Sequence, residues 1–100
     1  VVIIILEKGD KLMKVVITVV GKDKPGIIAN VGKRCADHNG TIVDITQKVL
    51  QDLFTMIMIV ELPEETELQK FSKDMQELEV EQGIKIHVMH EDIFNAMHTI

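Results

Sequence analysis

The chain has 100 residues and a formal net charge of −5, and hydrophobic residues make up 46% of it. A chain of this length forms one domain with a single core between two layers. The acidic balance, with only three Phe and neither Trp nor Tyr, argues against nucleic-acid binding, which needs a basic stripe and usually aromatic platforms.

Cys35 is the sole cysteine of the sequence. One thiol forms no internal disulfide and supplies too few ligands for a cysteine-based metal site. No apolar run approaches the roughly 18 residues that a membrane-spanning helix requires. The apolar residues 1–6 are too short for a signal-peptide core, and Glu7 follows them. We therefore expect a cytoplasmic protein with no membrane partner.

The first twelve residues, VVIIILEKGDKL, differ in character from the segment that starts at Met13. Lys8-Gly9-Asp10 can be encoded by a purine-rich stretch that contains the bacterial ribosome-binding consensus. Met13 stands at about the spacing that such a site requires. We expect residues 1–12 to be translated leader or cloning-derived sequence, and residues 13–100 to form a single domain.

Residues 14–20 are rich in β-branched side chains and end at Gly21, which predicts a strand. Pro25 suits the first position of a helix. Apolar residues then recur at helical spacing, at Ile28, Val31 and Cys35. Asn39-Gly40 tolerates positive φ and predicts the end of this helix.

Residues 41–50 alternate in the manner of a strand. One face of this strand carries Val43, Ile45, Gln47 and Val49, and the other carries Asp44, Thr46 and Lys48. Gln51-Asp52 predicts a tight turn. Residues 53–62 form a second strand that is apolar on both faces, so the two strands are expected to make a hairpin.

Pro63-Glu64-Glu65 predicts the start of a second helix, because acidic residues are favoured at the positive end of the helix dipole. The apolar stripe of this helix comprises Leu68, Phe71, Met75, Leu78 and Gln82. Gly83 ends it, and residues 84–89 alternate as a last strand. Asp92 is expected to cap a short C-terminal helical turn.

The order from Met13 is β-α-β-β-α-β, which predicts an α+β fold of the ferredoxin-like type. Right-handed crossovers place both helices on one face of a four-stranded antiparallel sheet, and a short C-terminal helical tail follows. The first strand lies in the middle of such a sheet. The alternative to a leader is a hairpin that pairs residues 1–6 with residues 13–20. This hairpin would find no free edge within the monomer.

The strand at residues 53–62 also indicates that the chain associates with a second copy. Helices cover only one face of the sheet, yet this strand is apolar on both faces. An uncovered apolar face is an aggregation liability, so we predict a homodimer, packed face to face or edge to edge. The alternative is that the C-terminal tail, from Ile93 to Ile100, folds over that face.

Catalytic and metal-binding patterns are not evident. The loop after the first strand lacks the Cys-x-x-Cys of metal-carrying ferredoxin-like modules and the arginine of an acylphosphatase-type site. His87 and His90 point to opposite faces of their strand. We therefore expect no enzyme activity, no metal and no cofactor. A small-molecule enzyme would need a base, and only Asp23, Asp44 or a histidine offers one.

The loop GKDKPGII, residues 21–28, is the candidate binding site. Its glycine spacing matches half of a phosphate-binding P-loop, but two isoleucines stand where Lys and Ser or Thr are required. The amides of residues 26–28 are unpaired at a helix start and attract an anion. Asp23 would repel a polyphosphate, whereas a zwitterion can place its ammonium on Asp23 or Asp44. The alternative is a plain turn in which Asp23 caps the helix and water fills the amides.

Three stretches of the chain resemble the ACT domain family. They are VxxxVGKDKPGIIA at residues 16–29, NGTIVDITQ at residues 39–47 and FTMIM at residues 54–58. The chain is most similar to small stand-alone ACT proteins and to the ACT modules of the glycine cleavage system repressor. The resemblance implies dimerisation and regulation by small ligands, held where the first loop and helix of one subunit meet the second strand of another. Carried over by position, the implied ligand-binding residues are Asp23, Gly26, Ile27, Ile28, Asn30, Asp44, Thr46 and Gln47.

Together these features predict a non-enzymatic regulatory domain that binds a small amino acid or a related metabolite as a homodimer. Because ACT modules usually act on an enzyme to which they are joined, we expect a partner enzyme or regulator. The alternative function is a ligand-free interaction module, which docks on an enzyme or regulator through its apolar surface.

Overall fold

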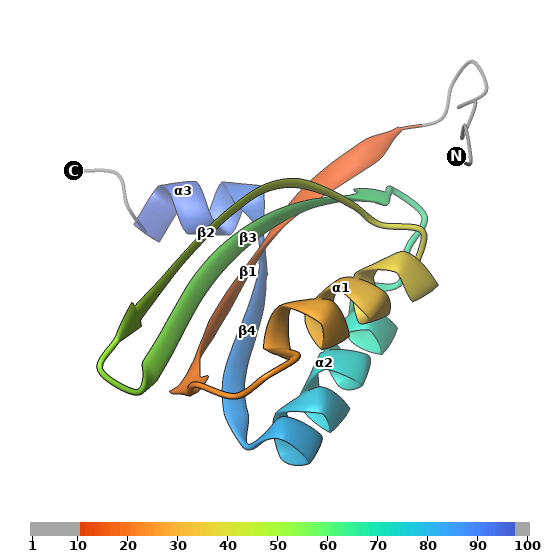
Figure 1. Cartoon of the computed structure of the whole chain (residues 1–100). Coiled ribbons are helices and arrows are strands. Elements are labelled where there is room, and N and C mark those ends of the chain that lie inside the picture. Colours follow the sequence, from red (N-terminus) through yellow and green to blue (C-terminus); the bar gives the residue numbers. More distant parts are fainter. Residues whose placement is uncertain (1–10, 98–100) are drawn as a thin grey trace.

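The computed structural model describes residues 11–97, which form a four-stranded sheet with two helices on one face (Figure 1). In chain order the elements are β1 (Leu12–Lys22), α1 (Ile27–Asp37), β2 (Thr41–Leu50), β3 (Leu53–Pro63), α2 (Leu68–Gln82), β4 (Ile84–His90) and α3 (Glu91–Met97). The strands lie in the order β2-β3-β1-β4, and every neighbouring pair is antiparallel. The predicted ferredoxin-like βαββαβ architecture with a short helical tail is confirmed.

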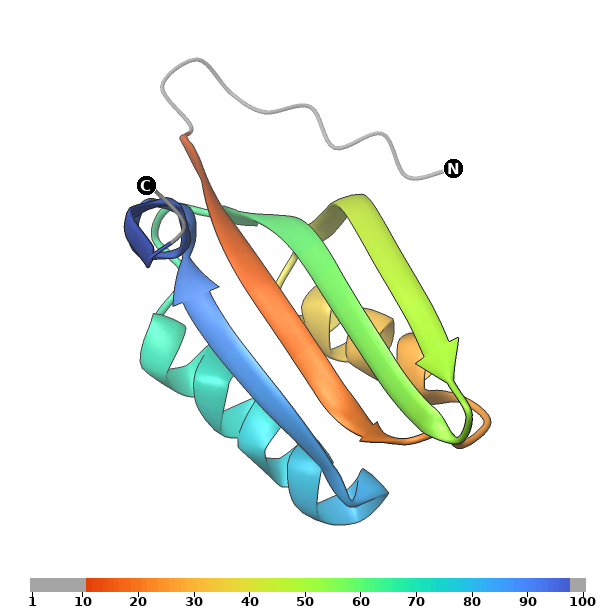
Figure 2. The same ribbon diagram turned by 90° about the vertical axis from the view of Figure 1, so that its left-hand side faces the viewer.

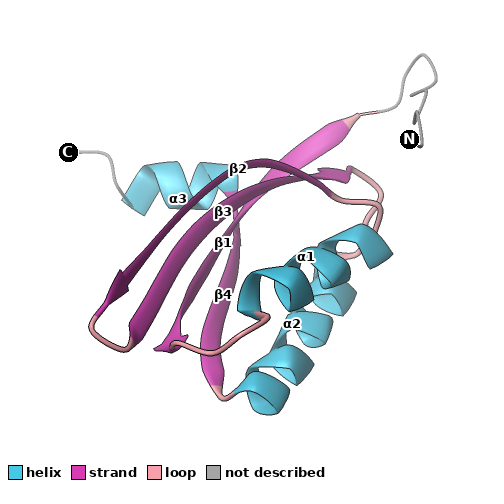
Figure 3. Cartoon of the chain, viewed as in Figure 1, coloured by secondary structure: helices cyan, strands magenta, loops and turns pink. Residues whose placement is uncertain are grey.

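The hydrophobic core lies between the sheet and the helices α1 and α2 (Figure 3). In register, Val15, Ile17 and Val19 of β1 stand opposite inward-facing residues of β3 and β4. The helices contribute their apolar stripes, which are Ile27, Val31, Cys35, Phe71, Met75 and Leu78. These stripes follow the helical spacing of the sequence. The predicted core positions Val31, Cys35, Phe71, Met75 and Leu78 are confirmed, whereas Ile27 and not the predicted Ile28 is the buried residue in the first turn of α1.

The first helix begins later than the sequence indicates. Pro25 and Gly26 form a turn, and Gly26 adopts φ of 87° at the N-cap of α1. A residue in this left-handed conformation cannot lie inside a right-handed helix. The helix therefore starts at Ile27, and the prediction that Pro25 is its first residue is wrong.

The second helix starts at Leu68 rather than at Pro63. Pro63 is the last residue of β3, and its carbonyl accepts a hydrogen bond from the Thr66 N–H at 2.9 Å. Proline is tolerated at the end of a strand, and the acidic pair after it forms a turn. Within residues 11–97, no helix combines the length and the apolar character that a bilayer crossing needs.

β1 begins at Leu12, one residue before Met13. The carbonyl of Lys11 accepts a hydrogen bond from the Glu64 N–H at 2.9 Å. The expected boundary between residues 12 and 13 stays a prediction. Residues 1–10, with both the leader and the hairpin interpretations of them, lie outside the described residues. From Val15 to Gly21, both sides of β1 are occupied by β3 and β4.

β2 is an edge strand, and all ten of its residues are exposed. A β-bulge shifts its register between Ile42 and Asp44. As a result Ile42, opposite the buried Val60, faces the helices with Ile45, and Val43 is the extra residue of the bulge. The alternation predicted for residues 41–50 is therefore correct from Asp44 onward and wrong at Val43.

The sheet face opposite α1 and α2, here called the open face, is seen in Figure 2. α3 stands on this side of the sheet, beside the end of β4, and contacts β1 and β4. On the open face Val16 is buried, whereas Val20 and Ile57 remain exposed. Within residues 11–97, α3 therefore covers only one end of the open face.

Two glycines of the first crossover, one inside α1 and one just after it, offer a matched test of packing. A Cβ on Gly40 would lie 2.8 Å from the Cys35 carbonyl oxygen and 2.9 Å from Leu62 Cδ2, whereas one on Gly32 meets only Ile42 Cδ1, at 3.7 Å. We expect Gly40→Ala to lower the free energy of unfolding by about 1–3 kcal/mol through overpacking. We expect Gly32→Ala to raise it by about 0.5–1 kcal/mol, because alanine suits a helix interior better. Urea unfolding measures both, and equal effects would contradict this packing.

Candidate functional site

The loop between β1 and α1 ends in a helix start that no side chain of the described residues caps. The first hydrogen bond of α1 joins the Asn30 N–H to the Gly26 carbonyl at 2.9 Å. The amides of residues 27–29 therefore precede the first intrahelical donor. Asp23 does not cap the helix, so that part of the plain-turn interpretation is wrong.

Two hydrogen bonds position this loop. The Asp23 N–H donates to the Asp52 carbonyl at 2.7 Å, which ties the loop to the β2–β3 turn. The Lys24 Nζ donates to the Gln82 carbonyl at 2.7 Å. Gln82 ends α2, where exposed carbonyls and the helix dipole favour a cation. The loop is thus held between the hairpin turn and the end of the second helix.

An open hollow of about 530 Å³ lies between the loop, the first turn of α1 and the hairpin of β2 and β3. Its lining residues are Asp23, Lys24, Gly26, Ile27, Ile28, Ala29, Gln47, Val49 and Phe54. Five of the predicted ligand-binding residues meet here, namely Asp23, Gly26, Ile27, Ile28 and Gln47. The first loop and the second strand therefore come together within a single chain.

The other three predicted residues lie elsewhere. Asn30 is close by, since a Cβ on Gly26 would lie 3.6 Å from its side-chain Nδ2. Asp44 and Thr46 stand opposite Ile59 and Ile57 in the register of β3, on the open face of the sheet. The structure therefore does not bring Asp44 and Thr46 to the hollow.

The sequence reasoning missed part of the lining. The lining residues that were not predicted as ligand-binding are Lys24, Ala29, Val49 and Phe54. Val49 lies two residues from Gln47 on the same strand face, and it pairs in register with the buried Phe54. Strand periodicity was therefore a signal that could have identified Val49. The arrangement has polar groups at its mouth and apolar side chains along its wall.

A charged cluster joins α1 to α2. Arg34 reaches the carboxylates of Glu81 at 3.2 Å, Glu77 at 3.6 Å and Asp74 at 3.8 Å. His38 Nε2 lies 2.6 Å from Asp74 Oδ2. These contacts bridge α1 and the residue that follows it to α2. Across residues 11–97, no group of three or more His, Cys, Asp or Glu is placed to hold a metal ion.

Cys35 lies on the core face of α1 and is 1% exposed. Burial raises the pKa of its thiol to about 12, because the thiolate would lose its hydration. The thiolate is the nucleophilic form of cysteine. In the folded protein this residue is therefore a small apolar core residue.

Comparison with known proteins agrees with the fold. Residues 13–89 match the family model of the ACT domain. A UPF0237 protein of Methanococcus maripaludis is 50% identical over 93 residues, which cover 86% of this chain and 97% of that protein. The structure of an ACT domain protein from Streptococcus pneumoniae is similar at a TM-score of 0.73 and 34% identity, covering 88% of this chain and 97% of that one. A glycine cleavage system transcriptional repressor shares the fold at a TM-score of 0.71 and 20% identity, covering 79% of this chain and 46% of that one.

The raised pKa of Cys35 predicts its reactivity. In the folded protein at pH 8 we expect iodoacetamide to leave this thiol unmodified, because it is both protonated and covered. Urea should expose the thiol and return its pKa to the ordinary range, so that labelling becomes rapid. Mass spectrometry after timed labelling measures both rates. Rapid modification of the folded protein would contradict the burial.

Proposed function

The chain belongs to the ACT domain family, whose members are typically ligand-binding regulatory domains, and from this premise we propose that it is a non-enzymatic, cytoplasmic sensor of a small amino acid. The sensor works as a homodimer and passes its signal to a partner enzyme or regulator. The observation that carries the proposal is the hollow that unites an uncapped helix start with the side chains of Asp23 and Gln47.

The polar groups of the hollow suit a zwitterion. The free amides at the start of α1 stabilise a carboxylate by hydrogen bonding and through the helix dipole. Gly26 leaves these amides approachable, since a Cβ there would meet only Asn30 within 4 Å. The exposed carboxylate of Asp23 forms no salt bridge with any described residue. It can therefore bind the ligand's ammonium group.

The wall of the hollow supports an aliphatic ligand side chain. Ile28 and Val49 are partly exposed beside the buried ring of Phe54. An aliphatic side chain removes apolar surface from water here, whereas a charged one would lose hydration without gaining a partner. Asp23 also repels phosphorylated ligands. We therefore assign the site to a small amino acid with an apolar side chain.

The edge strand β2 supports the homodimer. Its outer backbone groups face no further strand among the described residues. Its exposed apolar residues are Ile42, Val43, Ile45, Val49 and Leu50. An edge of this kind is a template for pairing with another chain. Antiparallel pairing of β2 with the partner's β2 would continue the sheet and bring the partner close to the open rim of the hollow.

This geometry suggests how a ligand would act. Gln47 and Val49 belong both to the edge strand and to the hollow. A ligand in the hollow therefore contacts a strand that also forms the subunit interface. If two subunit arrangements shape the hollow differently, the ligand shifts the population toward the arrangement that binds it more tightly.

The same edge also favours a second function. A ligand-free module could pair its exposed β2 with a strand of an enzyme or regulator, by strand addition. This alternative predicts that the isolated chain is a monomer and that it recovers a partner from lysate with or without added amino acids. Both results together would contradict the homodimer.

Calorimetry against the twenty amino acids tests the ligand site. We expect the aliphatic members to bind, and Gly26→Val to remove binding because its side chain covers the amides. Asp23→Asn should weaken binding by roughly tenfold to a hundredfold, since a hydrogen bond to a charged group contributes about 1.5–3 kcal/mol.

Two controls accompany this measurement. Gly26→Val also places a β-branched residue at φ 87°, which strains the backbone. The circular dichroism spectrum and molar mass of this variant must therefore match those of the wild type, to show that it is folded. Gly32→Ala, on the same helix but outside the hollow, should bind normally. If the folded wild type binds none of the twenty amino acids, or if Gly26→Val binds them normally, the proposed ligand site is wrong.

Light scattering tests the edge interface. Ile45→Lys combined with Val49→Lys places two charges on the exposed edge strand, where lysine opposes strand pairing. We expect this variant to have half the molar mass of the wild type. Val80→Lys, which changes an 85% exposed residue of α2, is the matched control and should leave the mass unchanged. An unchanged mass of the double variant would exclude pairing through β2.

A further inference from the structure

The second edge of the sheet is β4, and the proposed function does not use it. The strand order β2-β3-β1-β4 leaves both outer strands with a neighbour on only one side among the described residues. The outer backbone groups of such a strand are a template for pairing with another chain. A sheet with two open edges can grow from both of them. A chain that pairs through one edge alone therefore needs a device that closes the other.

An outer backbone donor of β4 is already bonded to a side chain of α2. The Ile86 N–H donates to Glu79 Oε2 at 2.7 Å, while β1 lies on the other side of the strand. Neighbouring residues of a strand direct their backbone groups to opposite sides. The outer row of β4 therefore comprises the backbone groups of Ile84, Ile86, Val88 and His90.

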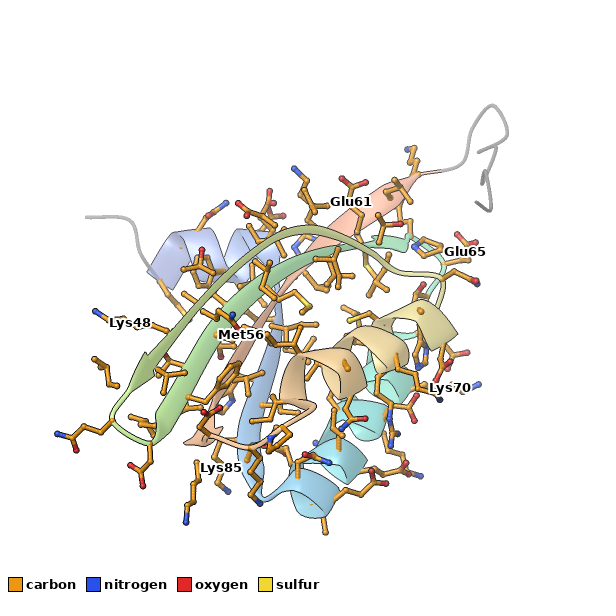
Figure 4. All side chains as sticks on the ribbon, viewed as in Figure 1. Lys48, Met56, Glu61, Glu65, Lys70 and Lys85 are labelled. Carbon is orange, nitrogen blue, oxygen red and sulfur yellow. The ribbon has the colours of Figure 1, made fainter. Side chains whose placement is uncertain are left out.

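The turn at Gly83 brings the two partners of this bond together. Gly83 ends α2 with φ of 65°, and its N–H donates to the Glu79 carbonyl at 2.8 Å. The chain then reverses into β4, and α2 runs alongside that strand (Figure 2). Figure 4 marks this end of the molecule with Lys85, the residue before Ile86. The Glu79 side chain thus reaches the outer edge of the strand that follows its own helix.

The Glu79 carboxylate is committed to this bond. It forms no salt bridge with any described residue, whereas Glu77 and Glu81 of the same helix both reach Arg34. A hydrogen bond to a charged acceptor is stronger than one between neutral groups. Ile86 is only 6% exposed, so little water competes for its N–H. The carboxylate is therefore held on the edge strand.

The rest of the outer row offers little length for pairing. Ile84 directly follows the end of α2, and His90 is the last residue of β4, after which α3 begins at once. Between these ends only Ile86 and Val88 present outer backbone groups, and Glu79 occupies the first of them. Closing this one donor therefore closes the middle of the edge.

We propose that Glu79 closes the outer edge of β4, so that strand pairing by this chain takes place at β2 alone. An incoming strand would have to displace the carboxylate from the Ile86 N–H, and its own carbonyl oxygens are neutral and weaker acceptors. The closure applies whether the partner at β2 is a second copy or another protein, because both add a strand to an edge. It does not depend on the ligand.

The edge of β2 has a different kind of contact. There the Ile45 N–H donates at 2.8 Å to the carboxylate of the preceding residue, Asp44, and both residues are exposed. A bond between adjacent residues ties the strand to no other element. An incoming strand can take over this donor while Asp44 stays in water. Glu79 in contrast belongs to a packed helix, and its bond joins two elements.

Light scattering in the edge variant, Ile45→Lys with Val49→Lys, tests the closure, because pairing through β2 is opposed there. Adding Glu79→Ala should produce a dimer that is paired through β4 and whose fraction grows with protein concentration. Adding Glu79→Gln should leave a monomer, since the amide oxygen still accepts from the Ile86 N–H. Adding Glu77→Ala, which removes a carboxylate from the same helix, is the matched control and should also leave a monomer.

The wild-type background separates this proposal from the β2 interface. With β2 open, Glu79→Ala should form assemblies whose mass rises with concentration beyond that of the wild type, whereas Glu77→Ala should not. This comparison holds even if the edge variant keeps the wild-type mass, a result that would contradict only the β2 interface. Equal masses of the Glu79→Ala and Glu77→Ala proteins in both backgrounds would overturn the closure.

Hydrogen exchange shows whether Glu79 holds the edge donor. In the edge variant, at a dilution where it is monomeric, Glu79→Ala should speed exchange of the Ile86 amide by roughly tenfold or more, because the amide then opens to water. The amide of Ile17, in the central strand, should keep its rate, which shows that the variant is folded. An unchanged rate at Ile86 would overturn the proposal.

Discussion

The central position of β1 is the constraint on which the rest of the structure depends. Its inward residues Val15, Ile17 and Val19 are fully buried, and β3 and β4 occupy both of its sides. With β1 enclosed, β2 must lie at the edge of the sheet. Right-handed crossovers then put α1 and α2 on the same face. The uncovered edge and the open face are consequences of this one placement.

The candidate site arises where this arrangement forces the chain to turn. β1 ends beside the β2–β3 turn, so the loop to α1 must pass the mouth of the hairpin. Gly26 makes the turn with a positive φ, and its lack of a side chain leaves the first amides of α1 bare. The same residue thus satisfies the backbone and opens the binding surface. A turn alone would require the glycine but not the carboxylate of Asp23, which lines the same hollow.

Much of the fold was predictable from local patterns, because helical and strand periodicities were strong in this sequence. The errors occurred where tertiary pairing overrides local preference. Pro63 looked like a helix start, but pairing with β1 keeps it in the strand. The bulge at Val43 interrupts the alternation of side chains between the two faces of β2. No single residue of the sequence indicates this bulge. The contact between Lys24 and Gln82 joins residues 58 positions apart, and no spacing rule reveals such a contact.

The candidate site was predicted less completely than the fold, for a physical reason. Transfer of family positions placed Asp44, Thr46 and Gln47 in one site, although adjacent residues of a strand point to opposite faces. The register assigns Gln47 to the hollow and Asp44 and Thr46 to the open face. A strand exposed on both faces can serve two surfaces at once. β2 does so here, because Gln47 and Val49 line the hollow while Asp44 and Thr46 lie on the open face.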